Sequence, residues 1–181
     1  AISGSTNALL HLPVIAKEAG VKIDADLFDK IQRDIPYLVN VRPAGRYSGE
    51  HFYYAGGVPS LMLKLSKYLD LQVLTVSGKT LGESLEEYKE SNKLTTQQSF
   101  LMNYGLKSEE VIRPLEDPIT AHGAIAVLKG NIAPDGCVIK HTALHQNMRL
   151  HTGRARVFEN ELDARNAIIN RDIKEGEVIV I

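Results

Sequence analysis

With 181 residues, the chain is long enough for one domain or two small ones with a substantial core. Its formal charge of -1 argues against nucleic-acid and anionic-membrane partners, and no apolar stretch approaches the roughly 20 residues of a transmembrane helix, so we expect a cytoplasmic protein. The single cysteine, Cys137, excludes an internal disulfide and an all-cysteine metal site made by this chain alone.

The chain begins with two predicted helices. Apolar residues favour a helix over 6–19, bent by Pro13 and closed by Gly20 in the left-handed conformation. Asp24 or Asp26 should then cap a second, short helix.

Strand-like and helix-like patterns alternate further on, which is typical of an α/β domain. Residues 38–41 are predicted to form a buried strand that ends before Pro43, and Pro59 is expected to start another helix. The polar segment 91–104 is interpreted as an inserted loop or a short surface helix outside the core.

A domain boundary is predicted at 114–122, where two prolines occur and apolar side chains are few. We assign 1–115 to the C-terminal part of an α/β domain and 116–181 to the first part of a β-barrel-like, swivelling domain. The second part is expected to hold one helix, about 161–169, among short apolar strands at 124–128, 137–139, 156–158 and 178–181.

The turn before the first helix is the candidate binding site. Gly4 is followed by the small polar residues Ser5, Thr6 and Asn7, and then by the apolar helix. Such residues can cap the unpaired amides of a helix start, or they can hold an anionic ligand there. The local sequence leaves both interpretations open.

Segment 123–140 indicates a strand, two turns and a second strand, with Lys129 and Lys140 at its inner margins. This segment resembles the opening of the C-terminal domain in the dihydroxy-acid dehydratase and 6-phosphogluconate dehydratase family. Six further segments resemble the same family in the same order: 4–12, 43–47, 55–59, 75–83, 153–158 and 173–181.

The resemblance implies a hydro-lyase that converts a 2,3-dihydroxy carboxylic acid into a 2-keto acid in branched-chain amino-acid biosynthesis. It implies an iron–sulfur cluster and Mg²⁺ in the full-length parent, with neither bound by this chain alone. The chain would be an excised piece of about a third of a typical family member, completed by the rest of its own polypeptide and assembled as a homodimer or higher oligomer. Ser5, Thr6 and Asn7 would bind the substrate, and no catalytic residue or metal ligand is assigned.

Two alternatives remain beside this function. Segment 55–59 is closer in character to sugar-acid dehydratases, which act on aldonates or 6-phosphogluconate, whereas 130–136 resembles the branched-chain pathway enzyme. The second alternative is that the chain by itself is a catalytically inactive structural fragment.

Four residues look like metal ligands but are interpreted otherwise. Cys137, at the start of a predicted strand, is expected to be a small core residue because one thiolate cannot hold a cluster. His141, His145 and His151 are expected to be solvated or hydrogen-bonded, since no carboxylate accompanies them at a ligand spacing.

Overall fold

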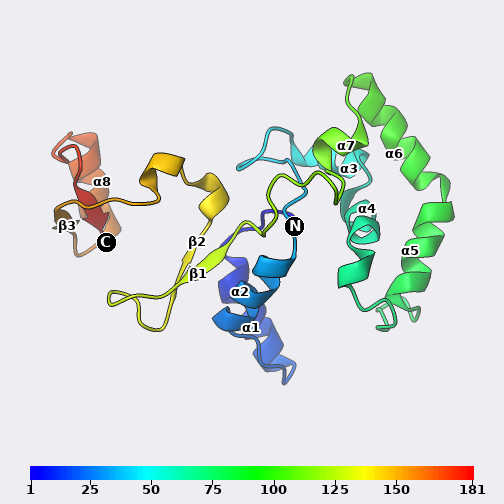
Figure 1. Cartoon of the computed structure of the whole chain (residues 1–181), viewed down its shortest axis with the longest axis horizontal. Helices are drawn as coiled ribbons and strands as arrows, with labels where there is room; N and C mark the ends of the chain where they lie inside the picture. Colours follow the sequence, from blue (N-terminus) through cyan, green and yellow to red (C-terminus); the bar gives the residue numbers. More distant parts are fainter. The chain divides into compact units, whose positions relative to one another are not determined.

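The computed structural model describes residues 1–181 and divides into two compact units, Ala1–Ala143 and Leu144–Ile181. Helices and short strands occur in both units, which confirms the mixed α/β class (Figure 1). No helix combines the length and the apolar character needed to cross a membrane. The domain boundary expected at 114–122 lies inside the first unit and stays a prediction.

The first unit contains seven α-helices, two 3₁₀ turns and one β-hairpin. Its helices are α1 (Ala8–Glu18), α2 (Ala25–Asp34), α3 (Gly49–Tyr54), α4 (Gly57–Lys64), α5 (Leu81–Glu90), α6 (Asn92–Asn103) and α7 (Ser108–Val111). The hairpin pairs β1 (Ala126–Leu128) with β2 (Cys137–Ile139), and the 3₁₀ turns are η1 (Ser66–Tyr68) and η2 (His141–Ala143).

Local sequence signals account for several of the helix ends. α1 contains Pro13 and is followed by Gly20 at φ +71°, as predicted. The Asp24 side chain caps α2 by accepting a hydrogen bond from the backbone amide of Leu27 at 3.0 Å. Of the two predicted candidates, the cap is therefore Asp24 and not Asp26.

The strand expected at 38–41 is absent. Tyr37, Val39 and Val41 make only isolated bridges, to Thr120, Ile112 and Tyr47 respectively. A strand requires consecutive residues to pair with one neighbouring segment, whereas here each partner comes from a different part of the chain. The segment is buried but irregular.

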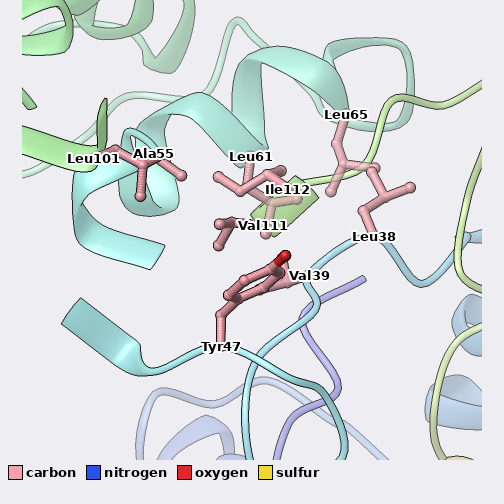
Figure 2. Close-up of a cluster of buried hydrophobic side chains, with 9 residues drawn as sticks. All are labelled: Leu38, Val39, Tyr47, Ala55, Leu61, Leu65, Leu101, Val111 and Ile112. Carbon is pink, nitrogen blue, oxygen red and sulfur yellow. The ribbon is translucent and has the colours of Figure 1, made fainter. Parts of the chain in front are cut away.

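The core of the first unit forms around this irregular segment, because α4, α6 and α7 contribute buried side chains to it (Figure 2). Phe52 and Tyr54 of α3 pack against this cluster. Leu101 on α6 is only 1% exposed and belongs to the cluster. The expectation that 91–104 lies outside the core is therefore wrong. The buried cluster consists of Leu38, Val39, Tyr47, Ala55, Leu61, Leu65, Leu101, Val111 and Ile112.

The second unit consists of η3 (Gln146–Met148), β3 (Ala155–Val157), α8 (Glu161–Ile169) and β4 (Val178–Val180). β3 and β4 pair in parallel, with Ala155 opposite Val178. α8 has the predicted bounds because the Asn160 side chain accepts the amide of Asp163 at 2.9 Å.

The β-barrel-like architecture expected for 116–181 is not confirmed. A barrel closes only when every strand has a neighbour on both sides. The four strands instead form two separate two-stranded sheets, β1–β2 and β3–β4, so each strand has one neighbour.

Candidate functional site

The turn before α1 exposes the three predicted substrate-binding side chains, Ser5, Thr6 and Asn7. Asn7 occupies the N-cap position, but its side chain accepts no hydrogen bond from the helix. The Ser5 hydroxyl accepts the backbone amide of Asn7 at 3.2 Å, which is a local turn contact. The side chains of Thr6 and Asn7 therefore make no capping hydrogen bond to the helix.

The first amides of α1 are already paired within the turn. The amides of Ala8 and Leu9 donate to the carbonyls of Ser5 and Thr6 at 3.0 Å, and that of Leu10 donates to Asn7 at 3.1 Å. A ligand at this turn would thus meet mainly side-chain groups, and not the unpaired amides that a helix start commonly offers.

The fold brings Lys140, at the end of the hairpin, against the segment that leads into this turn. Its Nζ atom donates to the carbonyl of Ser3 at 2.9 Å, in a partly buried position. Ser3 has φ +57°, a conformation uncommon for a residue other than glycine. The sequence had indicated Lys140 only as the margin of a hairpin, so its place beside this turn is a result of the tertiary structure.

Two buried hydroxyls near this contact have no hydrogen-bond partner. They are Ser3 Oγ and Thr142 Oγ1, the second of which lies two residues after Lys140. A buried hydroxyl without a partner is unfavourable, and native proteins rarely leave one unpaired.

Helix α2 fixes the position of the hairpin. Asp29 accepts the Val127 amide of β1 at 3.2 Å and pairs with Arg33 at 2.7 Å. The Arg33 guanidinium, followed by the Val127 amide, lowers the pKa of the Asp29 carboxyl. Lys129 reaches Asp26 at 2.8 Å, and this hydrogen bond raises the pKa of its ammonium group. Because these contacts hold β1, and β1 pairs with β2, Lys140 at the end of β2 lies against Ser3, which precedes the N-terminal turn.

The histidines bind backbone atoms, as expected. His141 Nε2 lies 2.6 Å from the carbonyl of Gly123, and His151 Nε2 lies 3.0 Å from that of Gly176. His145 Nδ1 accepts the amide of Asn147 at 3.4 Å. These ring nitrogens therefore serve local structure.

The donor atoms of this chain do not fit an iron–sulfur cluster, because such clusters are held by several thiolates. Cys137 is the only thiol, and it is exposed at the start of β2 rather than buried in the core as predicted. No three histidine, cysteine or acidic side chains lie together as a metal site would require.

A groove of about 660 Å³ lies among α3, α4, α5 and α6 and is lined largely by aromatic side chains and by residues 56–59. Hydrogen bonds hold its walls together: the Tyr88 hydroxyl contacts the Gly56 carbonyl at 2.9 Å and Gln97 at 2.8 Å, and Gln97 donates to the Tyr53 carbonyl at 2.9 Å. Most of the segment that resembles sugar-acid dehydratases, 55–59, thus forms one wall of this groove.

Comparisons with known proteins cover both ends of the chain. Residues 1–84 match the family model described as dihydroxy-acid/6-phosphogluconate dehydratase N-terminal, and residues 110–181 match the corresponding C-terminal model. Among curated proteins, the chain is 44% identical over 181 residues to a dihydroxy-acid dehydratase of Methanosarcina barkeri and 43% identical over 181 residues to one of Methanothrix thermoacetophila. A dihydroxy-acid dehydratase of Halothermothrix orenii is 42% identical over 183 residues.

These alignments include 100% of the chain but only 30–31% of each relative. The similarity therefore extends through both units and also through 85–109, the stretch between the two family matches, which contains most of α5 and all of α6. The chain belongs to the dihydroxy-acid/6-phosphogluconate dehydratase family.

Proposed function

We propose that this chain acts within a longer polypeptide that removes water from a 2,3-dihydroxy carboxylic acid and forms a 2-keto acid. The supporting observation is the 44% identity, along the whole chain, to a protein named dihydroxy-acid dehydratase. The proposed role is a step of branched-chain amino-acid biosynthesis in the cytoplasm. The longer polypeptide is proposed to work as a homodimer or a higher oligomer.

In the proposed reaction, the C2 proton and the C3 hydroxide leave the substrate, and the resulting enol tautomerises to the 2-keto acid. Negative charge develops at C2, beside the carboxylate, and on the hydroxyl oxygen that leaves C3, so the site must hold the substrate carboxylate and hydroxyls firmly. We assign that binding task to Ser5, Thr6 and Asn7, whose side chains are exposed around the start of α1.

The iron–sulfur cluster and Mg²⁺ that the family resemblance implies are assigned to other segments of the longer polypeptide. The reason is the donor set, because one exposed cysteine cannot supply the thiolates of a cluster. No step of the reaction is therefore attributed to these groups through residues of this chain.

A sugar-acid dehydratase is the second candidate, because residues 56–59 line the groove of about 660 Å³. A polyhydroxylated chain such as an aldonate would need more polar partners than a branched dihydroxy acid. The third candidate is a folded segment with a structural role only.

The test compares this chain with the longer polypeptide for iron content and for release of 2-keto acid. The substrates are 2,3-dihydroxy-3-methylbutanoate and D-gluconate, which separate the first two candidates. We expect iron and turnover of the dihydroxy acid only in the longer polypeptide. Turnover of gluconate alone would favour the second candidate, and no turnover by either protein would favour the third.

Variants of the longer polypeptide test two of the site residues, Thr6 and Asn7. Thr6→Val and Asn7→Ala should raise KM or lower kcat, because each removes a polar group without breaking a helix cap. Thr95→Val, at an exposed position on α6, is the matched control. Unchanged kinetics in the first two variants would contradict the assignment.

A further inference from the structure

We infer that Lys140 supplies the positive charge of the Ser5–Asn7 site and binds the carboxylate of the hydroxy-acid ligand, an inference that rests on the proposed function. The contact that carries it is the 2.9 Å hydrogen bond from Lys140 Nζ to the carbonyl of Ser3. This bond places an ammonium group against the backbone of Ser3, two residues before Ser5 in the sequence. The hydroxyl and amide side chains of the turn are neutral, so the lysine adds the charge that recognition of an acid requires.

The ammonium group of Lys140 has capacity left for a ligand. It carries three donors, and its one hydrogen bond goes to a neutral carbonyl. None of the ion pairs in the structure involves Lys140. A partly buried ammonium without a counter-charge is unfavourable, and a carboxylate ligand would correct this.

Two hydroxyls on the segments around Lys140 have no hydrogen-bond partner. Ser3 Oγ and Thr142 Oγ1 are both buried and unpartnered, on the two chain segments that the lysine contact joins. Both oxygens are covered in this structure, so the inference rests on the Lys140 ammonium group and not on these hydroxyls. The amides at the start of α1 are paired internally, so the inference does not depend on them.

Lys129 provides a natural comparison within the same hairpin. It is exposed, and its Nζ atom already pairs with Asp26 at 2.8 Å. The two lysines at the margins of the hairpin therefore differ in the property that matters here, because only Lys140 lacks an acidic partner.

The experiment is an NMR titration of the ¹⁵N-labelled 181-residue chain with 2,3-dihydroxy-3-methylbutanoate and, separately, with its methyl ester. Signals of residues 3–7 and 139–142 report binding. We expect the acid to bind about tenfold or more tightly than the ester, the gain for a hydrogen bond to a charged group. Lys140→Met should abolish this preference, and Lys140→Arg should largely retain it. Lys129→Met should behave like the unaltered chain.

The outcomes separate the inference from the proposed function. If the acid binds at residues 3–7 and keeps its advantage over the ester in Lys140→Met, the inference is wrong and the assignment of Ser5–Asn7 stands. Equal binding of acid and ester to the unaltered chain leads to the same conclusion without any variant. If neither ligand at millimolar concentration shifts the signals of residues 3–7, the binding role of the turn is refuted, and the inference with it.

Discussion

Leu101 is the position at which the structure departs most clearly from expectation, and Leu101→Ala tests that departure. The side chain is 1% exposed and packs in the core beside Ala55 (Figure 2). The substitution removes three buried carbons, which costs about 2.4 kcal/mol at about 0.8 kcal/mol each. The cavity left behind adds to this, so we expect a loss of about 3 to 4 kcal/mol in the free energy of unfolding.

Urea denaturation followed by far-UV circular dichroism measures this loss. Met102→Ala is the control, because Met102 is the next residue of α6 and is 68% exposed. Its effect should stay within about 0.5 kcal/mol. If Leu101→Ala costs less than about 1 kcal/mol, or no more than Met102→Ala, then α6 is not part of the core and the reasoning fails.

Asp29→Asn tests the contact between α2 and β1. The Arg33 guanidinium lowers the pKa of Asp29, so its stabilisation is present above the unfolded pKa of about 3.9 and is lost as pH falls through the folded value. The unaltered chain should therefore lose about 1 kcal/mol more than Asp29→Asn between pH 7 and pH 2.5 in thermal melts, and equal losses would contradict the contact. Gly56→Ala should cost about 3 kcal/mol, because φ is +105° and a Cβ atom would lie 1.9 Å from the Ser60 hydroxyl. Gly78→Ala, at φ +79° with open space around it, should cost only about 1 kcal/mol, and similar losses in both would refute the steric argument.

Elements governed by nearby residues were predictable from the sequence. Helix α8 has the predicted bounds because Asn160 caps it locally, and Gly20 follows α1 because glycine adopts positive φ at little cost. The hairpin was predictable for the same reason, since its two turns are set by short glycine- and proline-containing segments. Family membership was also accessible, because the motifs that carry it are continuous in the chain.

Contacts between distant segments were not predictable in this way. Leu101 is the one buried residue of α6, and its place in the core depends on segments far away in the sequence, whereas the polar composition of α6 indicated a surface position. The segment at 38–41 looked like a strand, but its bridging partners are scattered along the chain. Cys137 was placed in the core by its neighbours in sequence, whereas the hairpin leaves it exposed.

The candidate site combines both kinds of information. Ser5, Thr6 and Asn7 are proposed from the chain alone, because a glycine and three polar residues before an apolar helix form a local pattern. The contact of Lys140 with Ser3 was visible only in the fold, since 137 positions separate the two residues. Local hydrogen bonds and backbone preferences act between neighbouring residues, so they can be predicted from the sequence. The contact of Lys140 with Ser3 depends instead on how α2 and the hairpin pack together, which only the tertiary structure determines.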